Sequence, residues 1–83
     1  MITVLFFAQL AESAQARSIQ LDVSEPKTAR DVAELAAAQL SDAFAAELFG
    51  GAVMVAVNKR QADWQTTVEP GDEVAFLPPF SGG

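Results

Sequence analysis

Only one stretch of this sequence has the apolar spacing of a long amphipathic helix, and strand-like stretches lie on both sides of it. Residues 29–40 repeat apolar side chains three and four positions apart, as on a helix with one buried face. Thr28 is a predicted N-cap, with Asp31 three residues later in a capping-box position. The buried stripe is predicted at Val32, Leu35, Ala36 and Gln39-Leu40.

Two strand patterns precede this helix. Residues 2–8 are rich in β-branched and aromatic side chains, and residues 18–23 alternate strictly between apolar and polar. They predict an antiparallel pair, joined by an alanine-rich connection over residues 9–16 with room for one helical turn. Alternation divides the first strand into two faces. These are Ile2, Val4 and Phe6 toward the core, and Thr3, Leu5 and Phe7 away from it.

The second half of the chain predicts one short helix and further strands. Ser41 caps a helix that runs to Phe49 and ends at a glycine pair. Residues 53–57 form a nearly continuous apolar run, which predicts a strand buried on both faces. A turn at 58–61, a weak strand over 62–68 and a tight turn at 69–72 follow. The last strand is predicted at 73–77.

The order is therefore two strands, a long helix, a short helix and further strands. It predicts an α+β fold of the β-grasp (ubiquitin-like) type, with a mixed sheet, adjacent first and last strands, and the main helix packed across them. A ferredoxin-like fold would need a second long helix, and residues 42–49 are too short for one. We expect a β-grasp domain over residues 1–77 and an extended tail over 78–83.

Composition limits the chemistry that this chain can perform by itself. Its 83 residues suit one domain, and a hydrophobic content of 51% is ample for a core. The sequence has no Cys, His or Tyr, so we expect no metal site and no side-chain nucleophile of the usual kinds. The net charge of −6 disfavours nucleic acids and anionic membranes as partners, and favours a basic surface on a partner protein.

The first residues are apolar but lack the positive segment of a signal peptide. No apolar run approaches the roughly 20 residues of a membrane span. We therefore expect a cytoplasmic protein.

The last six residues have the composition of a thin, extended arm. Pro78-Pro79 stops the last strand and favours an extended exit. Phe80 suits an apolar pocket on a partner or the domain's own surface, and Ser81 is small. Gly82 and Gly83 form the thinnest peptide available, so the α-carboxylate of Gly83 is the expected reactive group. Six residues reach at most roughly 20 Å, enough to enter a buried site on another protein.

Three segments carry a resemblance to a known family. Residues 71–83 closely resemble the C-terminal signature of the molybdopterin synthase small subunit family. Residues 4–8 resemble the first strand of that family, and residues 55–58 its central strand and turn. Phe80 departs from the pattern, which usually has valine or another small aliphatic residue there. Sulfur carriers of thiamine synthesis share the fold and the two glycines, but are typically shorter and lack the two prolines.

The resemblance implies a sulfur carrier for molybdenum cofactor biosynthesis. A ubiquitin-activating-like enzyme would use ATP to adenylate Gly83, and a sulfur donor would convert it to a thiocarboxylate. The tail would then enter the large subunit of molybdopterin synthase and give sulfur to cyclic pyranopterin monophosphate. This chain would be a sulfur-donating subunit without bound cofactor, because the catalytic side chains and the ATP belong to partners. A ubiquitin-like protein modifier, a thiamine-type carrier and an interaction domain with an inert tail are the alternatives.

The alternation of side chains along the first and last strands also predicts a docking surface at the base of the tail. If the first and last strands are neighbours, Leu5, Phe7, Ala75 and Leu77 form one exposed apolar patch. We expect Phe7 and Leu77 to contact the partners. The alternative is that the short helix or the Trp64 segment covers them.

Overall fold

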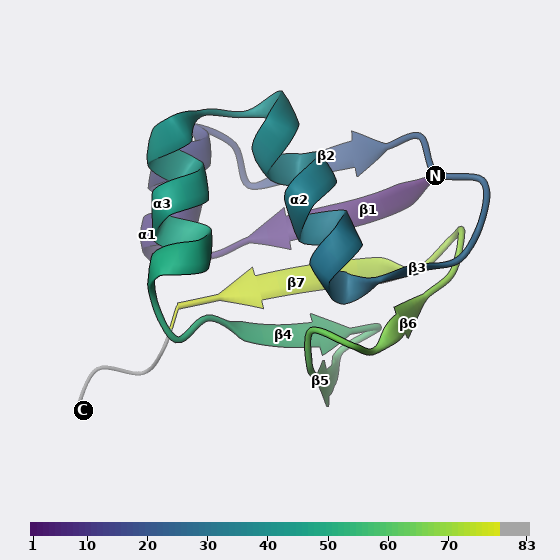
Figure 1. Cartoon of the computed structure of the whole chain (residues 1–83). Coiled ribbons are helices and arrows are strands. Elements are labelled where there is room, and N and C mark those ends of the chain that lie inside the picture. Colours follow the sequence, from purple (N-terminus) through teal and green to yellow (C-terminus); the bar gives the residue numbers. More distant parts are fainter. Residues whose placement is uncertain (79–83) are drawn as a thin grey trace.

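The computed structural model describes residues 1–78. It contains helices and strands in an order that matches the predicted α+β class (Figure 1). The helices are α1 (Ala8–Ala14), α2 (Ala29–Gln39) and α3 (Asp42–Gly50). The strands are β1 (Ile2–Phe6), β2 (Ser18–Leu21), β3 (Lys27–Thr28), β4 (Met54–Val57), β5 (Arg60–Ala62), β6 (Thr67–Val68) and β7 (Glu73–Leu77).

The main sheet is mixed and has β7 at its centre. Its strand order is β2-β1-β7-β4-β5, with β1 and β7 parallel and the other neighbours antiparallel. The predicted adjacency of the first and last strands is thus confirmed. In Figure 1, α2 lies across one face of this sheet, and α1 and α3 lie near the end where β7 stops.

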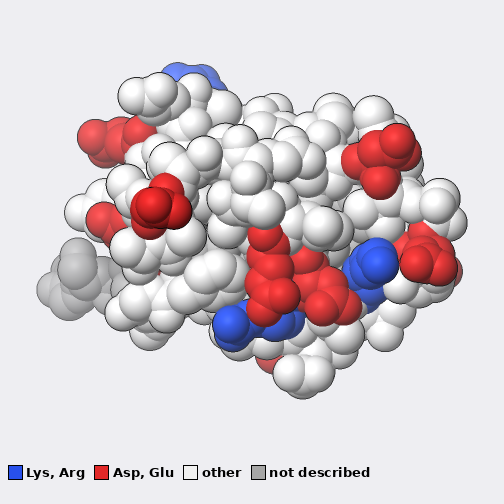
Figure 2. Space-filling model, turned by 45° about the horizontal axis from the view of Figure 1, so that its top comes forward, with Lys and Arg blue, Asp and Glu red and all other residues white. Residues whose placement is uncertain are grey.

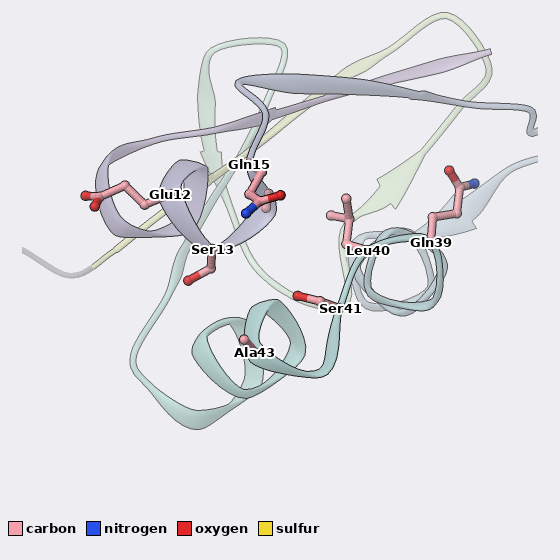
Figure 3. A pocket seen from close by; sticks show the side chains of 8 residues that line it. Glu12, Ser13, Gln15, Gln39, Leu40, Ser41 and Ala43 are labelled. Atoms are coloured by element: carbon pink, nitrogen blue, oxygen red, sulfur yellow. The ribbon is translucent and has the colours of Figure 1, made fainter.

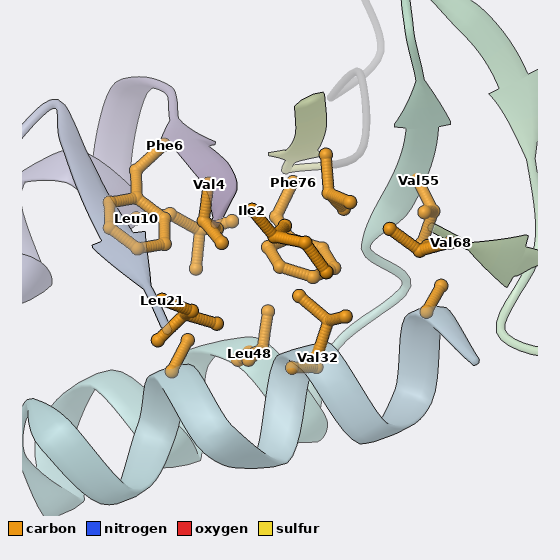
Figure 4. Close-up of a cluster of buried hydrophobic side chains, with 14 of the residues drawn as sticks. Ile2, Val4, Phe6, Leu10, Leu21, Val32, Leu48, Val55, Val68 and Phe76 are labelled. Atoms are coloured by element: carbon orange, nitrogen blue, oxygen red, sulfur yellow. The ribbon is translucent and has the colours of Figure 1, made fainter. Parts of the chain in front are cut away.

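The core lies between the inner face of the sheet and the helices. Figure 4 shows Val4 of β1 and Phe76 of β7 pointing toward the helices, where Val32 of α2 and Leu48 of α3 meet them. Phe6 and Phe44 pack edge to face, with ring centroids 4.9 Å apart, which ties β1 to α3. Buried apolar surface of this kind is the main stabilising contribution in a small domain.

The two predicted helix starts are confirmed by hydrogen bonds. The backbone N–H of Asp31 donates to Thr28 Oγ1 at 3.1 Å, and the backbone N–H of Thr28 donates to Asp31 Oδ2 at 3.3 Å. The backbone N–H of Phe44 donates to the Ser41 hydroxyl at 3.1 Å. These side chains satisfy N–H groups that a helix leaves unpaired in its first turn.

The connection between β1 and β2 is more ordered than predicted. It forms the seven-residue helix α1, which buries Leu10 and Ala14 four positions apart. As a result β1 ends at Phe6 and not at Ala8. Ala8 has a φ of 51° and Gln15 a φ of 57°, so each end of α1 contains a non-glycine residue in the left-handed region.

Burial was predicted wrongly in both α2 and β4. Leu35 and Gln39 were expected in the buried stripe of α2, but Leu35 is 40% exposed and Gln39 is also exposed. The reason is that α2 packs through Ala29, Val32, Ala33 and Ala36. The strand over 53–57 was expected to be buried on both faces, but Met54 is 38% exposed. The helices cover only one face of the sheet, so the alternate residues of β4 point away from the core.

The turn predicted over 58–61 and the weak strand predicted over 62–68 are only partly correct, because β5 already begins at Arg60 and β6 covers only Thr67–Val68. β5 is a hairpin partner of β4, across a turn in which Asn58 and Lys59 both have positive φ. β6 pairs with β3 in a separate two-stranded sheet. Elements of two or three residues carry too little pattern to be predicted from sequence.

Candidate functional site

The last described residues form the base of the predicted tail. β7 ends at Leu77, and Pro78, the last described residue, is half-buried. Phe76 lies opposite Phe6 of β1 on one side and Val55 of β4 on the other. The tail therefore starts from the best-supported strand of the sheet. The other predicted tail residues lie outside the described residues, and their roles stay predictions. They are Pro79, Phe80, Ser81, Gly82 and Gly83.

The outer face of the sheet carries an apolar surface beside this base. The register places Leu5 opposite Ala75, Ala75 opposite Ala56, and Leu77 opposite Met54. Directly opposed residues point to the same side, and this side faces away from the buried Val55 and Phe76. We call this surface the outer-face patch. It comprises Leu5, Phe7, Met54, Ala56, Ala75 and Leu77.

The structure places the two predicted contact residues, Phe7 and Leu77, at the tail end of parallel neighbouring strands. Phe7 is 44% exposed, and Leu77 is partly exposed. Neither α3 nor Trp64 covers the outer-face patch, because both lie on the inner side of the sheet. Phe44 of α3 packs against Phe6, and Trp64 packs against Phe76. The role of Phe7 and Leu77 in binding a partner stays a prediction.

Sequence reasoning missed Met54. Within the described part of the chain, Met54 is one of the most exposed large apolar residues. It lies opposite Leu77 and extends the outer-face patch from β7 onto β4. Its position between Val53 and Val55 gives no alternation that would reveal an open face.

The outer face becomes polar toward the other end of the sheet. Thr3, Gln20 and Glu73 occupy the outward positions there, and Gln20 Nε2 donates to Thr3 Oγ1 at 2.9 Å. The apolar part of the face is thus concentrated where the tail leaves.

A hydrogen-bonded cluster fixes the start of β7. The Asp72 carboxylate accepts from the backbone N–H of Glu69 at 2.9 Å and from Asn58 Nδ2 at 3.0 Å. Asn58 Oδ1 accepts in turn from the backbone N–H of Glu73 at 3.0 Å. The backbone bond from Glu69, followed by the bond from Asn58, holds the pKa of Asp72 below its usual 3.8. This cluster lies at the end of β7 opposite the tail, so it positions the strand and takes no part in chemistry at the tail.

An aromatic group supports β7 from the inner side. The Trp64 ring stacks on Phe76 with centroids 5.9 Å apart, and Phe49 lies 6.2 Å from Trp64. The Arg30 guanidinium lies 4.5 Å from the centre of the Phe49 ring and forms an ion pair with Glu34 at 3.1 Å. This group connects α2, α3 and the β5–β6 connection behind the last strand.

A groove opens beside Phe7, between the end of β1 and α1. Its volume is about 650 Å³. Its lining is mostly apolar, with one acidic and one basic side chain. The lining residues are Leu5, Phe6, Phe7, Ala8, Ala11, Glu12 and Arg17.

A second hollow, of about 540 Å³, lies between α1 and the α2–α3 junction (Figure 3). Ser13, Gln15 and Gln39 line it together with Glu12 and Ser41. The Ser41 hydroxyl already caps α3, and Glu12 is the only titratable group.

The described residues offer little chemistry of their own. They contain no group of three or more Asp or Glu side chains placed to hold a metal ion. Acidic side chains are distributed over the surface shown in Figure 2, as the net charge of −6 requires. Within residues 1–78, no helix has the length and apolar character needed to cross a membrane.

Comparison with known proteins places this arrangement in a family. The model of the ThiS family matches residues 4–83. The molybdopterin synthase sulfur carrier subunit of Haemophilus influenzae is 41% identical, and that of Escherichia coli is 39% identical. Each alignment covers 83 residues, which is 100% of this chain and 100% of the relative.

Solved structures share the fold. The crystal structure of SAMP1 from Haloferax volcanii has a TM-score of 0.83 and 31% identity, covering 99% of this chain and 98% of that one. The complex of subunits 1 and 2 of molybdopterin-converting factor from Helicobacter pylori matches with a TM-score of 0.66 and 20% identity. That match covers 99% of this chain and 97% of that one, and it supports the fold alone.

The β-grasp prediction is therefore confirmed, and so is the resemblance that the tail motif suggested. With a family match over nearly the whole sequence and curated homologues aligned from end to end, this chain belongs to the ThiS family of sulfur carriers, among homologues of the molybdopterin synthase sulfur carrier subunit.

Proposed function

We propose that this protein is the sulfur carrier subunit of a molybdopterin synthase. The observation that carries the proposal is the 41% and 39% identity to two such subunits along their full length. The family match extends through the two terminal glycines of the printed sequence. The absence of Cys, His and Tyr supports a chain whose reactive group is a main-chain carboxylate.

The chemistry begins with activation of Gly83. A carboxylate is a poor electrophile, so one of its oxygens attacks the α-phosphorus of ATP and releases pyrophosphate. In the acyl-adenylate, AMP is a good leaving group. Written with hydrosulfide as the donor, sulfur attacks the acyl carbon, the bond to AMP breaks, and one proton is released. The product is a thiocarboxylate. We propose that its sulfur bonds to a carbon of cyclic pyranopterin monophosphate, and that water then cleaves the bond between the acyl carbon and the sulfur, which leaves the sulfur on the pterin and restores the Gly83 carboxylate. Two such transfers supply the two sulfurs of a dithiolene.

The base of the tail fits this role. β7 is held on both sides, by β1 and β4, so the tail starts from a rigid point. Pro78 and Pro79 restrict the chain to extended conformations, and Gly82 adds no side chain beside the reacting carbon. We propose that Phe80 and Ser81 line the wall of the partner's channel.

We propose two protein partners for the outer-face patch: the large subunit of molybdopterin synthase and a ubiquitin-activating-like adenylating enzyme. The names of the two curated relatives, each a sulfur carrier subunit of molybdopterin synthase, support the first. The patch lies beside the base of the tail, so we propose that a protein that receives the tail also contacts Phe7 and Leu77. One surface for two partners makes the complexes mutually exclusive, as a shuttle requires. ATP is bound by the adenylating partner, and we propose a cytoplasmic location, where ATP is available.

The test uses the purified chain, both partners, ATP and a sulfide source, with conversion of cyclic pyranopterin monophosphate as the readout. Removal of Gly83, or addition of one residue after it, is expected to abolish conversion while circular dichroism stays unchanged. Gly82→Val is expected to reduce it strongly because the channel has no room for a side chain. The matched control is Gly50→Ala, since a Cβ at Gly50 meets no atom within 4 Å. Normal conversion by the chain without Gly83 would refute the proposal.

A second candidate is a protein modifier that is joined to lysine side chains through Gly83. The likeness to SAMP1, a protein named small archaeal modifier protein 1, favours it. Both functions begin with the same adenylation. Covalent adducts heavier than the chain itself, formed in cell extract with ATP, would identify a modifier.

A further inference from the structure

We propose that the groove beside Phe7 receives one apolar side chain of the large subunit, and that Arg17 at its rim pairs with a carboxylate next to that side chain. This inference rests on the proposed function and adds a specificity contact to it. The lining, the position and the charges of the groove support it separately.

The lining suits an apolar side chain. Leu5, Phe6 and Phe7 contribute large apolar groups, while Ala8 and Ala11 are small and leave a volume of about 650 Å³ open. A space of this kind is filled favourably by a leucine, methionine or phenylalanine side chain, which loses contact with water on entering.

The position makes the groove continuous with the outer-face patch. Leu5 and Phe7 belong to both surfaces. Phe7 is held in place because its carbonyl accepts from the backbone N–H groups of Leu10 at 3.1 Å and Ala11 at 3.4 Å. A partner protein that covers the outer-face patch and binds the tail therefore also lies over the edge of the groove. One of its side chains can then enter the groove.

The charges of the groove select the partner. Glu12 and Arg17 are both exposed and line it, and the ion pairs of the described residues include neither. The carbonyl of Arg17 accepts from the backbone N–H of Phe6 at 2.9 Å, which fixes the position of Arg17 beside the end of β1. A partner carboxylate is attracted to Arg17 and repelled by Glu12, so the two charges also set the orientation of the partner.

Arg17 differs in position from the other basic residues of this acidic chain. Lys27 pairs with Glu25, and Arg30 pairs with Glu34. Lys59 and Arg60 follow β4, whose last residue lies opposite Val74 near the start of β7, away from the tail. Arg17 precedes β2, whose first residue lies opposite Leu5, at the tail end. It therefore provides a positive charge within the proposed interface.

The experiment measures the affinity of the full chain for the purified large subunit by calorimetry at low and high salt. Arg17→Glu is expected to weaken binding by at least about tenfold, with a smaller loss at high salt. Ala11→Leu, which fills the groove, is expected to weaken it at least as much at both salt concentrations. Arg60→Glu is the matched control, with the same charge change on an exposed site, and is expected to bind as the wild type does.

Several outcomes would overturn the inference. If the wild type binds and both folded groove variants bind equally well, the groove is not part of the interface and the proposed function still stands. If the wild type fails to bind the large subunit, the proposed function fails and the inference fails with it. If sedimentation shows that the chain dimerises and that Ala11→Leu prevents this, the occupant is a second copy. If Phe80→Ala shifts the methyl resonance of Ala11 in the isolated chain, the occupant is the chain's own tail.

Discussion

Truncation of Phe7 to alanine tests the outer-face patch, and its effect can be calculated from exposure. Phe7 is 44% exposed. For a side chain of roughly 200 Å², about 90 Å² remains for a partner to cover. At about 25 cal/mol per Å², this area contributes about 2 kcal/mol to binding. The dissociation constant for each partner is therefore expected to rise about 30-fold.

The assay is calorimetric titration of the variant with each partner, after circular dichroism and thermal unfolding have shown that it is folded. Met54→Ala, on the same face and 38% exposed, is expected to weaken binding in the same direction. Leu35→Ala is the matched control, because Leu35 is 40% exposed but lies on α2, on the other side of the sheet. Equal losses for Phe7→Ala and Leu35→Ala, or no loss for Phe7→Ala and Met54→Ala, would show that the outer-face patch is not the interface.

Three further predictions concern stability. Thr28→Ala removes the capping box of α2 and should lower the free energy of unfolding by about 1 kcal/mol, seen as a lower urea midpoint; an unchanged midpoint would contradict this. Arg30→Met removes the guanidinium from the Phe49 ring and should cost about 0.5–1 kcal/mol, since the site is exposed, with a change in Trp64 fluorescence as a second readout. Because the pKa of Asp72 is lower in the folded than in the unfolded chain, its stabilising effect is complete above 3.8 and is lost as the pH falls below that value. Urea unfolding at several pH values should therefore show a shallower acid loss of stability for Asp72→Asn than for the wild type, and equal slopes would refute the role of Asp72.

The strands at the two ends of the chain were predictable because alternation specifies faces directly. Leu5 and Leu77 occupy the outward positions that their parity predicts, and the pairing of β1 with β7 brings them to the same part of the sheet. Caps were predictable for a related reason, since Thr28 and Ser41 act within one turn of their own position.

Other features depend on tertiary packing and could not be predicted. A continuous apolar run has the same pattern whether one or both faces are covered, so the exposure of Met54 is invisible in sequence. In α2 alanines occur all around the helix, and which side packs depends on the sheet beneath it. This is why Leu35 was placed wrongly. Ala8, in the left-handed region, and the groove beside it depend on how α1 is joined to β1.

The candidate site was predictable only in part. The base of the tail and its apolar surroundings follow from strand parity. The roles of Gly82 and Gly83 come from composition and from the family, because the chemistry belongs to the main chain and leaves no cluster of side chains to recognise.

The intact mass of the chain tests the central claim most directly. The purified protein is incubated with ATP, the adenylating partner and a sulfide source, and is then measured by mass spectrometry. A sulfur carrier predicts a mass increase equal to the difference between one sulfur and one oxygen atom, dependent on ATP and located at Gly83 by fragmentation. An unchanged mass under conditions in which the adenylating partner consumes ATP would contradict a carrier role.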